Sequence, residues 1–334
     1  MEKTFIVGTA SLALAWSFIA LTPDQGSAQD AGEQALKRCN YIRMIVPYTA
    51  GGGGDVGARL LAPFMTEDLG VSVQIENQPG AGSQIGITAL AKAKPNGCTI
   101  GWTHLPAAIA IYLDPSRQAA FNRQSLAPIA MYVVDPGGIA VKGDSPYNSL
   151  GDLVKAAKEK PGAITVSDSG VLSDGHLLLL ELQRQTGAQF AIVHSGGGAE
   201  GTADLLGGHV DAQAINLGGP NASMVASGQM KLLAAFTKDP QPDYPGVQTA
   251  EQQGFNIYSS TSRALSAPAG TPQPIIDRLS QSVEKAVELP AFKSKAAAAA
   301  LNVTYMNSQE TGAYWDNTEK TFGPLIADVV AKNK

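Results

Sequence analysis

The chain has 334 residues, of which 44% are hydrophobic and 16% are charged, and its net charge is −5. This balance excludes an intrinsically disordered chain, because disorder requires low hydrophobicity and high charge. The acidic net charge also gives no basic footprint for nucleic acid, so we expect no nucleic-acid partner.

The N-terminus has the three parts of a secretory signal. Lys3 precedes an apolar run over residues 5–21, and small residues follow around Ala28. This pattern is typical of a cleaved export signal. The alternative is an uncleaved membrane anchor, for which the run is barely long enough. We predict a signal peptide over residues 1–28 and a periplasmic mature protein.

From residue 40 onward, short apolar runs alternate with longer helical patterns. We predict strands at residues 42–47, 71–76 and 99–103 and helices at residues 55–69 and 83–93. Such alternation is typical of βαβ units with a parallel sheet covered on both faces. Residues 126–141 are predicted to hold further strands around a turn at Asp135-Pro136-Gly137-Gly138.

A second series of the same kind follows. Its first helix, at residues 149–159, is predicted to begin at the N-cap Ser149 and to stop at Pro161-Gly162. Further strands are predicted at residues 164–167, 190–193, 212–215 and 231–237, and further helices at 175–186, 198–206, 272–288 and 312–330. Two successive series indicate two lobes rather than one sheet.

Cys39 and Cys98 are the only cysteines, and each lies just before a predicted strand. If those strands lie side by side in a parallel sheet, both cysteines sit at one end of it, and a disulfide is plausible in an oxidising compartment. Closing that loop would contribute roughly 4 kcal/mol. The alternative is two buried free thiols. The pair lacks the short C-x-x-C spacing of metal sites, and we expect no metal.

The strongest motif is the glycine loop from Tyr48 to Asp55 (YTAGGGGD), between a predicted strand and a predicted helix. Glycines let backbone N–H groups approach a ligand, and the positive end of the helix favours an anion. Asp55 fits the helix N-cap. The loop matches neither a P-loop nor G-x-G-x-x-G, which argues against nucleotides. Taken alone, the motif fits a flexible turn equally well.

Two more loops with small residues follow predicted strands, at residues 77–83 (NQPGAGS) and 167–173 (SDSGVLS). The first opens on the same carboxyl edge of the sheet as the glycine loop. That edge is where open α/β sheets bind ligands. The hydroxyl groups of the second loop are suited to face it across a cleft.

Together these motifs resemble the signature of one receptor family. They are VPYTAGGGGD at 46–55, ENQPGAGS at 76–83, KPNGCT at 94–99, SDSGVLSDGH at 167–176, ADLLGGHVD at 203–211 and APAGTP at 267–272. In order and spacing they are similar to the periplasmic receptors of tripartite tricarboxylate transporters, the Bug family. The resemblance covers nearly the whole mature chain.

The resemblance implies an α/β, two-lobed periplasmic-binding-protein fold (type II-like) with a ligand cleft between the lobes. We assign residues 40–133 plus 258–334 to lobe 1 and residues 134–257 to lobe 2. The implied ligand is a small carboxylate, and the implied partners are the membrane components of a tripartite transporter. We expect a monomer without cofactors and without enzymatic activity.

The expected ligand contacts form two jaws and a set of strand-end residues. Carried over from the resemblance, the first jaw is Thr49, Ala50, Gly51, Gly52 and Asp55, beside Tyr48, and the second is Ser169, Gly170 and Ser173. By position alone, the further candidates are Thr103, His104, Asn216 and Arg263. Arg263 is suited to a second carboxylate, and the alternative is a surface or hinge arginine. For His104 the alternative is a histidine that caps a strand.

The chain departs from the family pattern at three places, the first of which is Cys98-Thr99, where members have Tyr-Thr after the Asn/Asp-Gly pair. His194-Ser195-Gly196 stands where members usually have a tyrosine and a lysine, and Ser262 stands where many have a tryptophan. The acid therefore stays open among di- and tricarboxylates, aromatic carboxylates, and amino or nicotinic acids.

Two other functions compete with transport. The segment from His194 to Gly198 (HSGGG) is similar to the oxyanion loop of lipases, but the chain has no G-x-S-x-G nucleophile motif. Ester hydrolysis that disappears in Ser173→Ala would support a serine-type α/β hydrolase. A receptor that feeds a sensor kinase needs the same liganded lobes, and the sequence does not separate it from a transport receptor.

Overall fold

The computed structural model describes residues 25–332 except residues 49, 51, 52 and 219. Most of the predicted signal segment, together with Thr49, Gly51 and Gly52, lies outside the described residues. Within the described part, no helix combines the length and the apolar character needed to cross a bilayer. The first described element is α1 (Gln25–Leu36), which packs on α9 (Gln273–Glu288).

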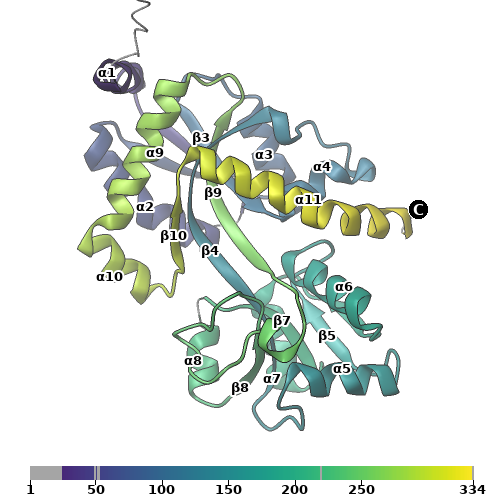
Figure 1. Cartoon of the computed structure of the whole chain (residues 1–334). Helices are drawn as coiled ribbons and strands as arrows, with labels where there is room; N and C mark the ends of the chain where they lie inside the picture. Colours follow the sequence, from purple (N-terminus) through teal and green to yellow (C-terminus); the bar gives the residue numbers. More distant parts are fainter. Residues whose placement is uncertain (1–24, 49, 51–52, 219, 333–334) are drawn as a thin grey trace, which may run out of the picture.

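The first lobe is built on a sheet with the strand order β2-β1-β3-β9-β4, and β10 pairs with β4 (Figure 1). Its strands are β1 (Ile42–Val46), β2 (Val73–Asn77), β3 (Thr99–Leu105), β4 (Leu126–Lys142), β9 (Ser260–Pro268) and β10 (Val303–Met306). β1 is parallel to β2 and β3, as the alternating pattern predicts. β9 runs antiparallel between β3 and β4.

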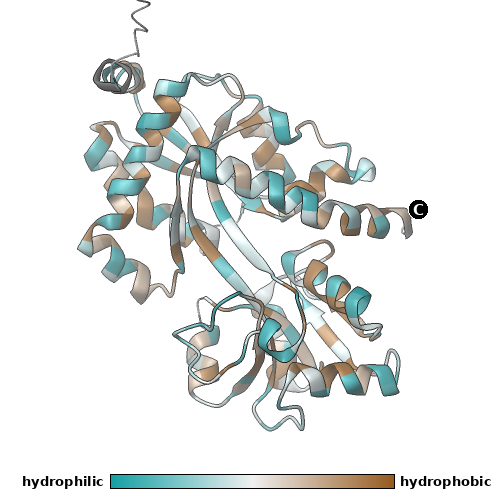
Figure 2. Cartoon of the chain, viewed as in Figure 1, coloured by the Kyte–Doolittle hydropathy of each residue, from teal (hydrophilic) through white to brown (hydrophobic). Residues whose placement is uncertain are grey.

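Helices cover both faces of this sheet. One core forms under α2 (Gly53–Leu69), α9 and α10 (Pro290–Ala298) and includes the fully buried Trp102. The other forms under α3 (Gln84–Ala91), α4 (Ala107–Leu113) and α11 (Ser308–Lys332) and includes Trp315. Figure 2 shows hydrophilic and hydrophobic residues mixed along these outer helices, as expected for helices with one buried face.

The second lobe repeats the arrangement on a smaller scale. Its strands are β5 (Thr165–Asp168), β6 (Ala191–His194), β7 (Ala212–Asn216), β8 (Met230–Ala235) and the distal end of β4. β5 is parallel to β6 and β7. One face packs on α5 (Leu150–Glu159) and α6 (Asp174–Thr186), the other on α7 (Gly198–Gly207) and α8 (Asn221–Ala226). The predicted N-cap Ser149 is confirmed, since its side chain accepts a hydrogen bond from Asp152 N.

The predicted turn at residues 135–138 is wrong, because these residues lie inside the continuous strand β4. Pro136 pairs with Ser260 of β9, and the next residue, Gly137, pairs with Asn216 of β7. The strand therefore changes partner here, from the first lobe to the second. Gly138 packs closely within the strand, since a Cβ there would lie 2.7 Å from the side-chain ends of Leu217 and Leu232.

Two strands thus connect the lobes: β4 leads into the second lobe and β9 leads back (Figure 1). The late segment returns to the first lobe, where α9 and α11 pack on β4. Because β4 belongs to both sheets, the boundary between the lobes falls within a strand, and the residue limits given above stay a prediction.

Cys39 and Cys98 form the expected disulfide, with their Cα atoms 5.5 Å apart. They precede β1 and β3, which are parallel neighbours with Arg43 opposite Thr99. The disulfide therefore lies at the amino ends of these strands, opposite the edge that carries the glycine loop.

Candidate ligand cleft

Polar residues gather where the parallel strands of both lobes end. In the first lobe β2 ends at Asn77 and β3 carries His104 near its end; in the second lobe β5, β6 and β7 end at Asp168, His194 and Asn216. Burial raises the pKa of Tyr48 in the first lobe to about 12, and the negative charge of Asp174 in the second adds to the rise. A charge in the second lobe thus acts on the Tyr48 hydroxyl of the first lobe.

Asp55 holds the first jaw together. It lies in the first turn of α2 rather than at the predicted N-cap. Its carboxylate accepts hydrogen bonds from Arg59 Nε at 2.8 Å and Asn77 Nδ2 at 2.9 Å. Asn77 Nδ2 also donates to the backbone oxygen of Tyr48 at 3.0 Å. Asp55 thus ties the glycine loop to the end of β2, which is a positioning role.

Tyr48 and His104 form the wall of the first jaw. Their rings stack with centroids 4.4 Å apart, and a Cβ at Gly54 would lie 3.1 Å from His104 Cε1. Burial lowers the pKa of His104 to about 3, and the charge of Arg263 acts in the same direction. The imidazole is therefore neutral at physiological pH. Its buried Nε2 has no hydrogen-bond partner in the described part of the chain.

Arg263 lies on β9, one of the two strands that connect the lobes. It is directly opposite His104 in the pairing of β9 with β3. Its side chain is only 12% exposed, which excludes a surface arginine. Nη2 is 3.7 Å from Asp135 Oδ2, and the buried Nη1 has no partner among the described residues. Asp135 is held by Gly218 N at 2.7 Å and Asn302 Nδ2 at 3.0 Å. Burial raises the pKa of Asp135 against the opposing charge of Arg263.

The second jaw is built around the start of α6. Ser173 is the N-cap of this helix, and its Oγ accepts from His176 N at 3.1 Å. Asn216 Nδ2 donates to Asp174 Oδ2 at 2.7 Å. His176 has a structural role, because its buried Nδ1 accepts from Leu172 N at 2.9 Å.

Asp168, His176 and His194 lie together, with their candidate ligand atoms within 4.8 Å of one another. Three such groups invite a test for a metal site. His176 Nδ1 accepts a backbone hydrogen bond, so in the neutral ring the hydrogen is on Nε2, which then has no lone pair for a metal. His194 Nδ1 is engaged by Asp168 at 2.9 Å. This donor set does not suit a metal ion.

The burial of His176 predicts a pH-dependent stability. Burial lowers its pKa to about 4 from an ordinary 6.5. Between these values the unfolded chain binds a proton that the folded chain does not, so the free energy of unfolding falls as the pH falls. Relative to His176→Asn, we expect the wild type to lose about 1.4 kcal/mol of its free energy of unfolding for each pH unit that the pH falls in this range. Urea unfolding of both proteins measures it, and parallel pH profiles would refute it.

His176→Asn is the matched variant because its amide oxygen can still accept the hydrogen bond from Leu172 N. Burial raises the pKa values of Asp135 and Asp168, whereas it lowers that of His176. These acids therefore also make the stability depend on pH. The difference between the two proteins, rather than either profile alone, therefore isolates His176.

Several of the described candidates lie at the carboxyl edges of the two sheets. Ala50 follows β1, Ser169 and Gly170 follow β5, and Asn216 is the last residue of β7. Thr103 does not fit, because it is fully buried and its Oγ1 lies 2.9 Å from Ser266 Oγ. Four residues were missed by the sequence reasoning: Asp135, Asp168, Asp174 and His194. The strand-end rule that selected Asn216 would also have selected Asp168 and His194.

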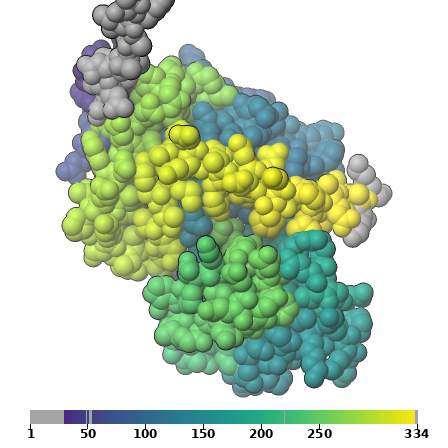
Figure 3. All heavy atoms as spheres, in the orientation of Figure 1, coloured from purple at the N-terminus to yellow at the C-terminus, as the bar shows by residue number. Residues whose placement is uncertain are grey.

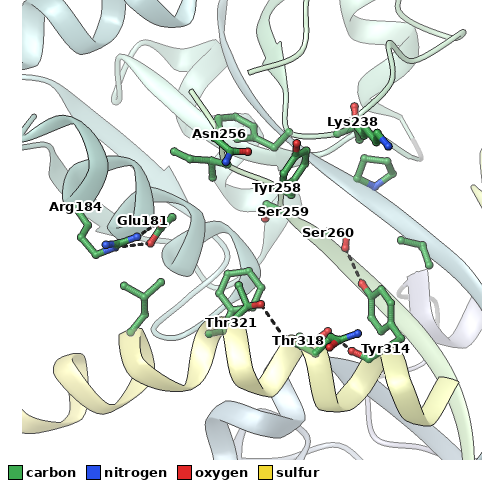
Figure 4. A pocket seen from close by; sticks show the side chains of 18 of the residues that line it. Glu181, Arg184, Lys238, Asn256, Tyr258, Ser259, Ser260, Tyr314, Thr318 and Thr321 are labelled. Carbon is green, nitrogen blue, oxygen red and sulfur yellow. Dashed lines mark hydrogen bonds and ion pairs between the residues drawn. The ribbon is translucent and has the colours of Figure 1, made fainter. Parts of the chain in front are cut away.

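A separate groove of about 820 Å³ lies on the opposite face of the connecting strands. Val134 and Pro136 of β4 line it, whereas Asp135 between them faces Arg263, because successive side chains of a strand point to opposite faces. Figure 3 shows this face, hollowed between α11 (yellow) and the second lobe (green and teal). In Figure 4, Thr318 and Thr321 on α11 stand across the groove from α6 and Tyr258.

The comparisons with known proteins agree with this geometry. The model of the tripartite tricarboxylate transporter family receptor matches residues 57–330. Protein BugT of Bordetella pertussis is 30% identical over 297 residues, 88% of this chain and 90% of BugT. A TctC solute binding protein from Polaromonas has a TM-score of 0.75 at 26% identity, covering 86% of this chain and 98% of that protein. An R. palustris protein with adipate has a TM-score of 0.72 at 25% identity, covering 85% and 97%. These likenesses confirm the predicted two-lobed fold.

Proposed function

The chain belongs to the family of tripartite tricarboxylate transporter receptors. On that premise we propose that it binds a small carboxylate between its lobes. We propose also that it delivers this ligand to the membrane components of such a transporter. We propose further that the protein is exported to the periplasm by cleavage near Ala28 and that it catalyses no reaction. In the described part of the chain, no serine hydroxyl is hydrogen-bonded to His194, the histidine that pairs with an aspartate. This supports a receptor over a serine hydrolase.

The ligand class is inferred mainly from the buried Nη1 of Arg263, which has no hydrogen-bond partner among the described residues. The guanidinium is nearly buried and is 3.7 Å from its nearest carboxylate oxygen. A buried charged donor without partners is costly, and a carboxylate satisfies it with two parallel hydrogen bonds. The R. palustris relative contains adipate, a dicarboxylate. We propose a ligand with one carboxylate at Arg263 and another at the glycine loop.

The proposed contact set follows from this placement. Asp55 serves as the positioning residue described above, and Thr103 is left out. The contacts are Tyr48, Thr49, Ala50, Gly51, Gly52, His104, Ser169, Gly170, Ser173, Asn216 and Arg263. The glycine loop would supply backbone N–H groups, for which its small residues are suited.

A thermal-shift screen tests the function directly. Purified mature protein is heated with adipate, citrate, phthalate, glutamate and nicotinate, each at millimolar concentration. A ligand present at about 100 times its Kd stabilises the folded state by about 2.7 kcal/mol, which raises the melting temperature measurably. Acetamide and hexanediol, which lack a carboxylate, serve as controls. The absence of a shift with every acid would refute carboxylate binding.

Closure of the cleft is the proposed mechanism, with residues 40–133 plus 258–334 forming one rigid lobe and residues 134–257 the other. The proposed cleft lies on the opposite face of β4 from the groove of Figure 4, since Asp135 faces Arg263 whereas Val134 and Pro136 line the groove. A rotation about the connecting strands that narrows the cleft therefore widens the groove. A ligand that contacts both lobes shifts the equilibrium toward the closed form. Small-angle scattering should show a smaller radius of gyration with saturating ligand.

Filling the groove should mimic part of this effect. Thr321→Trp adds bulk on α11 where it faces the second lobe, and so disfavours the open form in which the groove is narrow. We expect the affinity for the carboxylate to rise about five-fold, which corresponds to about 1 kcal/mol. Isothermal titration measures it. Lys320→Trp is the matched control, because the exposed Lys320 does not line this groove. Unchanged or weaker binding by Thr321→Trp would contradict the closure geometry.

Delivery to a transporter needs a separate test in cells. Deleting the gene should abolish uptake of the acid that gives the largest thermal shift. Induction of transport genes is measured in the same strain. Loss of induction with uptake intact would favour the sensor-kinase alternative.

A further inference from the structure

Asp168 and His194 form a pair at the carboxyl edge of the second-lobe sheet. They end the adjacent parallel strands β5 and β6 and lie opposite each other in the register. His194 Nδ1 is 2.9 Å and 3.0 Å from the two oxygens of Asp168. Asp168 is fully buried, and Gly170 N donates to its Oδ1 at 2.7 Å. The carboxylate is thus fixed and orients the imidazole.

This geometry determines which nitrogen of His194 is free. A carboxylate accepts hydrogen bonds, so His194 Nδ1 carries a hydrogen and Nε2 has the lone pair. The side chain is 35% exposed, so it has access to solvent and to a ligand. A neutral Nε2 can only accept a hydrogen bond, so its lone pair repels the oxygens of a carboxylate. A protonated Nε2 donates one to it.

The pair lies beside residues of the second jaw. A Cβ at Gly170 would be 3.8 Å from the backbone oxygen of Ser195, and a Cβ at Gly198 would be 3.9 Å from Ser169 Oγ. The loops after β5 and β6 therefore form one surface. His194 is part of it, next to two proposed ligand contacts.

The charged groups packed around His194 are acidic. Asp168 on β5 is its direct partner. From α6, His176 places its ring 4.6 Å away, with a pKa lowered by burial to about 4, and Asp174 lies in the first turn. From α7, Glu200 accepts from Gly196 N, and Asp204 accepts from Ser195 Oγ. These charged neighbours are acids, and the neighbouring histidine is neutral.

We propose that His194 is a ligand-binding residue of the second jaw and that it takes up a proton when a dicarboxylate binds. This inference rests on the proposed function. The cleft already holds Asp135 and Asp174, whereas Arg263 offers one positive charge. A dianion therefore gains from a second cation, which the Asp168–His194 pair supplies by protonation. The receptor then binds the acid together with a proton, and binding tightens as the pH falls.

Isothermal titration measures how many protons the protein takes up when the ligand binds. Adipate and phthalate are titrated into the mature protein between about pH 6.5 and pH 8.5, where both acids are ionised, in buffers with different ionisation enthalpies. We expect an uptake between zero and one proton, and an affinity that rises about five-fold or more from the top to the bottom of this range. His194→Asn keeps a donor for Asp168 but cannot titrate, so its uptake should vanish and its affinity should be flat with pH.

The controls separate the possible failures. His209→Asn removes an exposed histidine that follows α7, and it should behave like the wild type. His194→Gln repeats the test with a second side chain if the asparagine variant folds poorly. Binding by the wild type without proton uptake, or with the same uptake in both His194 variants, would overturn this inference alone. If neither acid binds the wild type, the proposed dicarboxylate function fails, and this inference with it.

Discussion

Replacing Arg263 with alanine is expected to weaken carboxylate binding by about 100-fold, which corresponds to about 3 kcal/mol. The guanidinium is 12% exposed and has no hydrogen-bond partner for Nη1 in the described part of the chain, so its donors are available to the ligand. Truncation removes a charge-assisted pair in a site largely shielded from water. It also leaves Asp135 without its nearby positive charge, which adds repulsion toward an incoming anion.

Variants of matched chemistry distinguish charge from geometry. Arg263→Lys keeps the charge but loses the planar fork, so we expect an intermediate loss of about ten-fold. Arg263→Ala combined with Asp135→Asn removes the repulsion and should recover part of the affinity. Arg184→Ala is the control, because Arg184 is 64% exposed, pairs with Glu181 and lines the groove behind the connecting strands. Isothermal titration that finds equal affinity for Arg263→Ala and the wild type would exclude Arg263 from the site.

Elements with a strong local signal were predictable from the sequence. The helix after Ser149 begins where its capping box begins, because the cap depends on residues three positions apart. The parallel strands β1, β5 and β7 are short apolar runs with turn residues on either side, and each is within about two residues of its prediction. The ends of these strands also predict which edge of each sheet holds the candidate ligand contacts, since parallel strands place their carboxyl ends together.

Features that depend on distant pairing were not predictable in this way. The residues from Asp135 to Gly138 have a strong turn composition, yet pairing with β7 and β9 extends them into β4. β9 itself was not assigned, so nothing in the sequence placed Arg263 opposite His104. The pairing of Asp168 with His194 likewise depends on β5 and β6 being neighbours. Each of these contacts is fixed by tertiary structure rather than by local propensity.

Local composition also left whole elements unassigned. α4, α10 and β10 are short, and their apolar positions gave no clear period. The sequence predicts an anion site at the glycine loop only through its flanking motifs, because glycines alone do not distinguish a binding loop from a flexible turn.

Removing the disulfide should change stability without changing affinity. Cys39 and Cys98 are 59 positions apart, and closing a loop of that length stabilises the folded state by about 4 kcal/mol through the entropy of the unfolded chain. We expect the double variant Cys39→Ser/Cys98→Ser to lose about this much in urea unfolding. The wild type treated with a reductant should behave in the same way, which controls for the substitution itself.

The position of the disulfide explains why binding should survive. It joins the amino ends of β1 and β3, whereas Tyr48 and His104 lie at their carboxyl ends. Pairing of β1 with β3 and the stack of Tyr48 on His104 hold the jaw independently of the disulfide. The affinity of the folded double variant should therefore stay within about two-fold of the wild type, about 0.4 kcal/mol. A parallel loss of affinity and stability would mean that the disulfide, rather than the hydrogen bonds of Asp55 and Asn77, sets the shape of the first jaw.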